Sequence, residues 1–175
     1  MSPAPADQVN AKELAGRAAS IRRSLPLNQL QRVTEAGALE GTQVGAELRF
    51  ASFEGKTTVD VQVGGVVVLV CQRCLKPCET VLDDGEQVMV VASGADEVPE
   101  GYEPFIGNPE SLSLTELIEE QVLLGLPLVP LHEDPALCRK SVRGRIVAKV
   151  EAEAQPENTQ TPFANLRDLL AKGEH

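Results

Sequence analysis

Alternating apolar and polar residues between positions 44 and 70 limit the fold of this chain more than any other feature of its sequence. The pattern repeats every two residues up to Phe50, resumes after Gly55, and passes through Gly64-Gly65 into an apolar run at 66–70. Successive side chains of a β-strand point to opposite faces, so this period predicts strands with one buried face. The apolar positions of the first strand are Val44, Ala46, Leu48 and Phe50.

Short connections predict that these strands form an antiparallel meander. A third strand pattern covers residues 80–91 and follows the second strand after a brief link. Parallel pairing would need a crossover of about a dozen residues or more. At Gly64-Gly65 the alternation breaks while the composition remains typical of strands, and this predicts a bulge or a sharp bend.

Helical patterns precede the strands. Asn10 and Glu13 have the spacing of a capping box and predict a helix that Pro26 ends. A short second helix is expected around residues 28–36. The expected buried face of the first helix consists of Leu14, Ala18, Ile21 and Leu25.

A further helix is predicted after the strands. Ser113 and Glu116 form a second capping-box pattern, and Gly125 ends the apolar period that follows it. Before this helix we expect an acidic loop at 93–112, and after it an extended segment at 126–131. The fold class is therefore α+β: an antiparallel β-meander with flanking helices and a flexible C-terminal arm.

We expect one main domain with peripheral segments. The predicted organisation is a flexible tail at 1–9, an α+β domain at 10–150, a flexible linker at 151–161 and a short amphipathic segment at 162–175. Such a short segment is only marginally helical alone, so its order should depend on what it packs against. The side chains predicted to dock it on the domain or on a partner are Phe163, Leu166, Leu169 and Leu170.

The charge distribution separates an acidic stretch from a basic one. The formal net charge of −10 argues against a protein that coats nucleic acid with its whole surface. Residues 77–138 contain no Lys or Arg, whereas 139–149 contain five basic residues and no acid. Runs of this kind are often only solvated surface. The candidate contact residues are Arg139, Lys140, Arg143, Arg145 and Lys149, with Arg73 and Lys76 joining them if Cys138 folds near the earlier cysteines.

Targeting features are absent from the sequence pattern. The first 25 residues lack the apolar stretch of about 7–15 residues that a signal peptide needs. The longest apolar run, Val66 to Cys71, is far shorter than the roughly 18 residues of a membrane span. We therefore expect a cytoplasmic protein without a membrane partner, in which four cysteines favour metal binding, redox chemistry or simple burial over disulfides.

Cys71 and Cys74 carry the strongest chemical signal. Two thiolates separated by two residues can bind one zinc ion, because a tight turn brings both sulfurs into its coordination sphere. Cys138, with either His132 or Cys78, would complete a tetrahedral structural site. The alternative is ordinary reduced and partly buried thiols. Redox chemistry is disfavoured because the motif lies between two strands rather than at the start of a helix.

Several of these pieces, in this order, resemble the YceD family of large ribosomal RNA subunit accumulation proteins. They are Val-Cys-Gln-Arg-Cys at 70–74, Gly-Tyr-Glu-Pro at 101–104, the apolar run into His132 at 124–132, Cys138, and Pro-Phe-Ala-Asn-Leu-Arg-Asp-Leu at 162–169. The resemblance covers roughly residues 20–171. It includes Arg73 and His132 but not Cys78, which favours His132 or solvent as the fourth ligand of any metal.

The resemblance implies a role in synthesis, processing or stability of large-subunit (23S) ribosomal RNA. We expect a non-catalytic ribosome-biogenesis factor whose basic residues contact this RNA or a pre-ribosomal particle. Alternatively, the acidic stretch binds a basic ribosomal protein, and the chain is a zinc-stabilised scaffold with no RNA contact of its own. An RNA-processing enzyme is disfavoured: His132 could act as a base, but the sequence has no phosphate-binding glycine loop, nucleophile motif or cofactor fingerprint, and no small-molecule substrate is evident.

Overall fold

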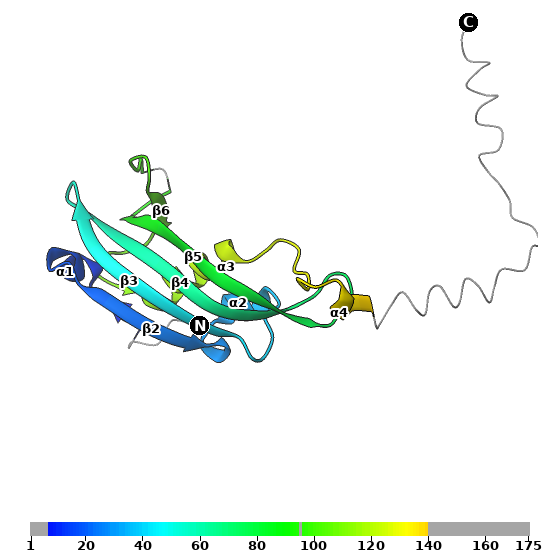
Figure 1. The fold of residues 1–175 in the computed structure, drawn as a ribbon. Helices are drawn as coiled ribbons and strands as arrows, with labels where there is room; N and C mark the ends of the chain where they lie inside the picture. The colour runs from blue at the N-terminus through cyan, green and yellow to red at the C-terminus, as the bar shows by residue number, and fades with distance from the viewer. Residues whose placement is uncertain (1–6, 95, 140–175) are drawn as a thin grey trace, which may run out of the picture. The chain divides into compact units, whose positions relative to one another are not determined.

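The computed structural model describes residues 7–94 and 96–139, and its main feature is a twisted five-stranded sheet (Figure 1). The chain divides into two units, Met1–Pro135 and Ala136–His175. The sheet and its helices belong to the first unit, and the described part of the second contains the short helix α4 (Ala136–Arg139). The strand order is β2-β3-β4-β5-β6. The chain is α+β, as predicted.

The predicted meander forms the centre of the sheet. Strands β3 (Gln43–Phe53), β4 (Lys56–Val70) and β5 (Pro77–Val91) pair antiparallel in sequence order. Glu54 and Gly55, with φ of 50° and 79°, make the two-residue turn between β3 and β4. Two successive residues of positive φ match the twist of a tight hairpin.

The pairing of β4 continues through its two glycines without an inserted residue, so the bulge, one of the two features predicted there, is wrong. Gly64 pairs with Gly45 of β3 and Asp83 of β5. Gly65 pairs with the next residue of each strand, Val44 and Leu82. Gly65 has a φ of +144°, and a Cβ there would overlap the backbone oxygen of Gln43. The glycine therefore permits close approach of two strands in continuous register, rather than the insertion of an extra residue.

The first predicted helix is much shorter than expected. Asn10 caps α1 (Ala11–Gly16) by accepting a hydrogen bond from the Glu13 N–H (3.0 Å), as the capping box predicted. Residues Ser20–Pro26, however, form strand β2, which pairs antiparallel with β3. The helical spacing of four apolar residues was overridden because strand β3 offers a full row of backbone partners and Leu25 is buried there.

The acidic loop predicted at 93–112 contains two short strands. Strand β6 (Glu103–Ile106) pairs parallel with β5 and forms the edge of the sheet. Strand β7 (Leu112–Ser113) pairs with β1 (Gln8–Val9) in a separate two-stranded sheet. Both elements are too short to produce a period in the sequence.

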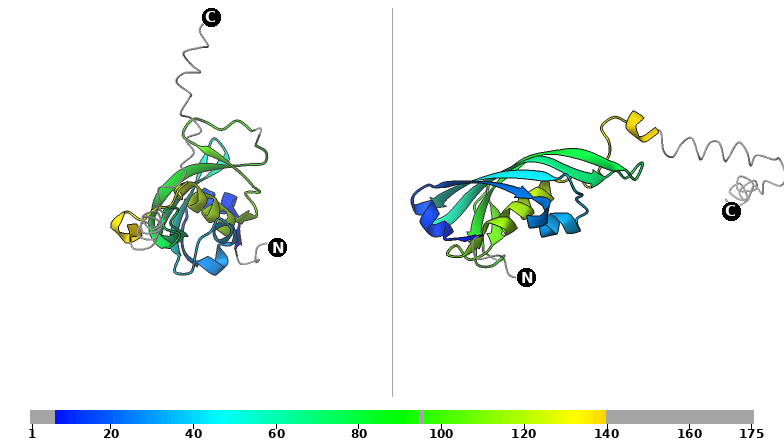
Figure 2. Two further views of the ribbon diagram at one scale, coloured as in Figure 1. Left: turned by 90° about the vertical axis from the view of Figure 1, so that its right-hand side faces the viewer. Right: turned by 90° about the horizontal axis from the view of Figure 1, so that it is seen from below.

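Helices α2 (Gln31–Glu35) and α3 (Leu114–Gly125) lie on the same side of the sheet, as the view from below shows (Figure 2). Helix α3 packs on β4 and β5, and α2 packs against α3 after the 3-10 turn Leu27–Gln29. The buried carboxylate of Glu119, 4% exposed, accepts a hydrogen bond from the Arg32 N–H (2.7 Å) and joins α3 to α2. Within the described part of the chain, no helix is long and apolar enough to cross a membrane.

Asp7 attaches the start of the described chain to the start of α3. Its carboxylate accepts hydrogen bonds from the hydroxyls of Ser113 and Thr115 (both 2.7 Å) and from the Thr115 N–H (3.1 Å). A negative charge is favourable there because the first N–H groups of a helix lack intrahelical partners. Residues 7–9 are thus held by hydrogen bonds, although the sequence predicted a flexible tail at 1–9, of which residues 1–6 lie outside the described part.

We expect Asp7→Ala to lower the free energy of unfolding by about 1–3 kcal/mol, because it leaves part-buried donors of Ser113 and Thr115 unpaired. Urea denaturation followed by circular dichroism measures the change. The control is Asp83→Ala, which removes an exposed carboxylate from β5. Equal stability of Asp7→Ala and the control would show that the carboxylate does not hold the helix start.

Candidate metal centre

The connection between β4 and β5 is a tight turn that carries Cys71 and Cys74. The Leu75 N–H donates to the Cys71 carbonyl (2.8 Å), and the Cys71 N–H donates to the Lys76 carbonyl (2.9 Å). Leu75 has a φ of 59°, a left-handed conformation that leucine rarely adopts. It is 74% exposed, whereas both cysteines are buried. The two cysteines lie in a tight turn, as the spacing of the motif predicted, and their burial shows that both sulfur atoms are directed inward.

The segment after α3 brings His132 to this turn. The Gln72 N–H donates to the Pro130 carbonyl (2.9 Å), which fixes the extended segment beside the turn. The Nδ1 atom of His132 then lies 3.5 Å from the Cys74 Sγ, although the two residues are 58 positions apart in the sequence. Residues 126–131 form neither helix nor strand, consistent with the predicted extended segment.

Four possible ligands gather here: Cys71, Cys74, His132 and Cys138. Each offers one ligand atom, and these atoms all lie within 4.8 Å of one another. A tetrahedral zinc ion with bonds of about 2.0–2.3 Å places its ligands about 3.3–3.8 Å apart. A contraction of about 1 Å would therefore convert the cluster into a zinc site, and three sulfurs with one imidazole are a donor set that zinc prefers.

Local hydrogen bonds favour a thiolate at Cys71. Burial alone would raise the pKa of this thiol, but N–H donors of the backbone at His132, Arg73 and Cys74, together with the His132 side chain, lower the pKa to about 5. The thiolate is the form of cysteine that binds metal ions. The turn thus supplies an anionic ligand at neutral pH before any metal arrives.

Cys78 has the opposite environment. Burial, with the nearby Cys71 and Cys74, raises the pKa of the Cys78 thiol above its usual value. It lies in β5 opposite Leu69 and is not part of the four-residue cluster. Of the two fourth ligands that the sequence left open, the geometry therefore groups His132 with the other cysteines. The CxxC motif lies in a hairpin connection without a following helix, the context that disfavoured redox chemistry.

The structure locates only some of the predicted contact residues. Arg73 and Lys76 are exposed on the same turn as Cys71 and Cys74. Arg139 ends α4, and nothing is described of its side chain. The other predicted contact and docking residues lie outside the described part of the chain: Lys140, Arg143, Arg145, Lys149, Phe163, Leu166, Leu169 and Leu170.

Sequence reasoning missed the backbone contacts that shape this centre. The left-handed Leu75 and the link from Gln72 to Pro130 have no signal in the residue types. A glycine after Cys74 would have indicated the conformation, but leucine did not.

Comparison with known proteins adds the family. Residues 59–170, which include the whole four-residue cluster, match the family model described as large ribosomal RNA subunit accumulation protein YceD. The chain belongs to the YceD family. A YceD-family relative from Haemophilus influenzae, named large ribosomal RNA subunit accumulation protein YceD, is 30% identical over 155 residues, which are 83% of this chain and 84% of the relative. No solved structure matches this YceD-family chain significantly.

Proposed function

We propose that this protein is a non-catalytic ribosome-biogenesis factor that promotes accumulation of large-subunit (23S) ribosomal RNA by binding. The observation that carries the proposal is the family match at residues 59–170, supported by the relative whose name states this role. The chemistry of the cysteine cluster is consistent with a binding protein. A zinc ion held by four protein ligands has no open position for substrate, so it would be structural.

The zinc site would make the turn between β4 and β5 rigid. Cys71, Cys74 and His132 would hold the ion with Cys138, and the metal would join the turn to the segment after α3. The exposed Arg73 and Lys76 would then be presented in fixed positions. RNA phosphates bind to clustered cations. The five basic residues of 139–149 would provide further cations for phosphate contacts.

We expect the double variant Arg143→Glu/Arg145→Glu to bind large-subunit ribosomal RNA about tenfold or more weakly. Two lost phosphate contacts would also reduce the slope of log affinity against log salt by about 1.4–1.8. Filter binding to transcribed 23S RNA at several salt concentrations measures both quantities.

The matched control is Lys12→Glu/Arg17→Glu, which makes the same charge change in α1 and at the residue that caps its C-terminus. Figure 1 places α1 at the end of the sheet away from the turn between β4 and β5. The control should bind almost like the parent protein, apart from the general effect of net charge. If Arg143→Glu/Arg145→Glu leaves the affinity and the salt slope unchanged, the basic residues do not contact the RNA.

The second candidate function is a scaffold that binds a basic ribosomal protein without touching RNA. The acidic residues of 77–138 favour it, since they repel phosphate and attract cationic segments. Crosslinking in cells, with sequencing of bound RNA and mass spectrometry of bound protein, separates this candidate from the first.

A further inference from the structure

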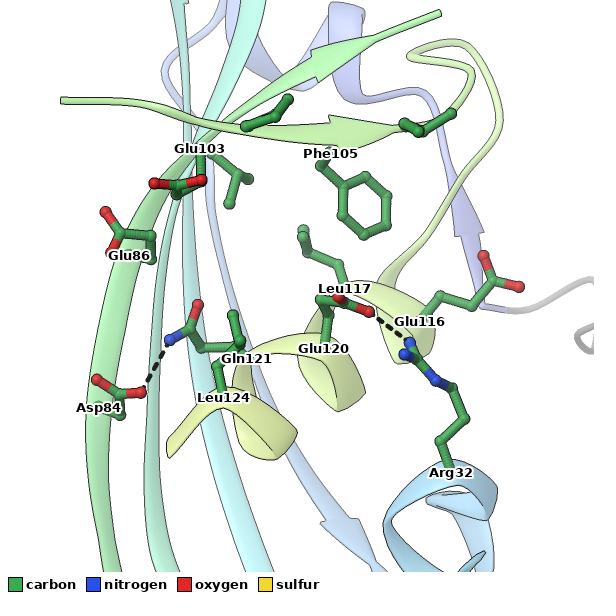
Figure 3. Close-up of a pocket in the computed structure, with 13 residues that line it drawn as sticks. Arg32, Asp84, Glu86, Glu103, Phe105, Glu116, Leu117, Glu120, Gln121 and Leu124 are labelled. Atoms are coloured by element: carbon green, nitrogen blue, oxygen red, sulfur yellow. Dashed lines mark hydrogen bonds and ion pairs between the residues drawn. The ribbon is translucent and has the colours of Figure 1, made fainter. Parts of the chain in front are cut away.

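A cavity of about 820 Å³ opens between α3 and the β5–β6 edge of the sheet, and none of the residues of the cysteine turn lines it (Figure 3). Gly125 allows the end of α3 to approach β5 closely, because a Cβ there would overlap Leu82 and Asp84. Toward its start, α3 faces β6 instead, and the Phe105 ring projects into the space between them (Figure 3). The cavity is therefore a groove bounded by strands on one side and a helix on the other.

The bed of this groove is apolar and partly open to solvent. Val88, Phe105 and Leu117 line it. At its margins the side chains of Ile106 and Leu124 remain 63% and 66% exposed. Exposed apolar side chains that border a concave surface are typical of a site where another molecule packs.

Carboxylates surround the apolar bed on both sides. Five acidic residues and one basic residue line the groove, and their formal charges of −5 and +1 leave a balance of −4. Within the described part of the chain, only one of the five carboxylates forms an ion pair, that of Glu120 with Arg32 (2.6 Å). In Figure 3 the acids of the strands lie on one side of the groove, and the carboxylates of α3 lie on the other, where Arg32 is placed. The five are Asp84, Glu86, Glu103, Glu116 and Glu120.

This combination selects the chemistry of a partner. Nucleic acid is disfavoured as a partner. Its phosphates would be repelled by the carboxylates of the groove, and the one arginine that lines the groove is already paired with Glu120. A purely apolar ligand would desolvate carboxylates without pairing them. A peptide with an apolar side chain between Lys or Arg residues satisfies both parts of the groove, since its cations reach the acidic margins while its apolar side chain enters the bed.

We propose that this groove is a docking site for a Lys- and Arg-rich segment of a protein partner, anchored by one apolar side chain. The anchor packs against Phe105 and Leu117, and the flanking cations pair with Glu86 and Glu103 on one side and Glu116 on the other. The proposal goes beyond the RNA-binding function, because the docking site includes neither the basic residues of 139–149 nor Arg73 and Lys76 of the cysteine turn. It deepens the scaffold candidate by naming the surface and the partner chemistry.

The test uses the full chain and two labelled peptides. One peptide has a single leucine between two pairs of lysines and arginines, and the other has serine in place of the leucine. Fluorescence anisotropy compares the parent protein with the triple variant Glu86→Gln/Glu103→Gln/Glu116→Gln. We expect the triple variant to bind the leucine peptide about tenfold more weakly, and the serine peptide to bind the parent protein several-fold more weakly.

The matched control is Glu79→Gln/Asp83→Asn/Glu100→Gln, which removes three exposed charges outside the groove. It should change the affinity by less than about twofold. A second variant, Ile106→Ser/Leu124→Ser, alters only exposed apolar side chains at the margin and should reduce the preference for leucine over serine. Thermal melting of each variant shows that it is folded.

Three results would overturn the proposal. In the first, the groove variant and its control weaken peptide binding equally. In the second, the parent protein does not bind the leucine peptide. In the third, single-stranded RNA displaces the peptide from the parent protein, and the groove variant does not bind this RNA. The last result would assign the groove to RNA. The RNA-binding proposal is tested separately with Arg143→Glu/Arg145→Glu. Failure of the docking site would appear in the peptide affinities, whereas failure of the RNA-binding proposal would appear as unchanged RNA affinity of that variant.

Discussion

Cys71→Ser should reduce the zinc content of the purified protein from about one ion per chain to less than about one tenth. The serine hydroxyl stays protonated at neutral pH, whereas hydrogen bonds lower the pKa of the Cys71 thiol to about 5 despite its burial. The variant therefore loses the ligand that is already anionic before metal binds. Inductively coupled plasma mass spectrometry of protein purified under reducing conditions gives the zinc content.

Loss of zinc should loosen one end of the sheet rather than unfold it. Hydrogen exchange should rise at 71–76 and 126–132, which the metal would join, while the paired centre of β3 and β4 stays protected. Chelation of zinc from the parent protein should reproduce this pattern.

Cys78→Ser is the matched control for the zinc site. Cys78 is buried next to the cluster but outside it, and its raised pKa keeps it a neutral thiol. The variant should keep its zinc, even if burial of a hydroxyl lowers its stability by about 1–3 kcal/mol. A zinc-free parent protein, or equal zinc in the parent and Cys71→Ser, would contradict a metal centre at this turn.

Gly65→Ala should destabilise the sheet by about 3 kcal/mol or more. The residue has a φ of +144°, a region that residues with a Cβ rarely adopt, and the new methyl group would overlap the Gln43 carbonyl of β3. Backbone cannot move aside as a flexible side chain can, so the strands must separate locally. Chemical denaturation gives the change in the free energy of unfolding.

Gly64→Ala provides the control one residue away. A Cβ at Gly64 would lie 3.7 Å from the Leu82 carbonyl oxygen, an ordinary contact, and this glycine has no positive φ. We expect a change within about 1 kcal/mol. If the two alanine variants have the same stability, the close approach of β3 and β4 at Gly65 does not constrain the sheet.

Sequence period predicted the elements whose partners are near in the chain. The strand patterns at 44–70 and 80–91 correspond to β3, β4 and β5, and the turn at Glu54 and Gly55 joins β3 to β4. Both predicted helix N-caps were confirmed by a hydrogen bond from the N–H three residues on to the capping side chain, at Asn10 and at Ser113. Such signals are reliable because a cap or a hairpin is completed by residues within a few positions of each other.

Elements that depend on distant partners were predicted poorly. Residues Ser20–Pro26 carry a helical spacing, yet they form β2 because β3 offers backbone partners that lie 17 positions (Pro26 with Gln43) to 29 positions (Ser20 with Arg49) further along the chain. The continuous register through Gly64-Gly65 was hidden for a related reason. A glycine pair in the sequence is compatible with a bulge or with close strand approach, and only the neighbouring strand decides between them.

By itself, the sequence determined the α+β class, the central meander, the pairing of Cys71 and Cys74 as candidate metal ligands, and the resemblance to YceD, because each depends on local spacing or on the order of short motifs. The resemblance favoured His132 or solvent over Cys78 as the fourth ligand, and the tertiary structure decided in favour of His132, which lies 58 residues from Cys74 in the sequence. The tertiary structure also assembled the acidic groove from α2, α3, β5 and β6. The physical reason is the same in both cases. Ligand geometry and concave surfaces arise where segments distant in the sequence pack together, and the type of a residue does not indicate which distant residues will lie beside it.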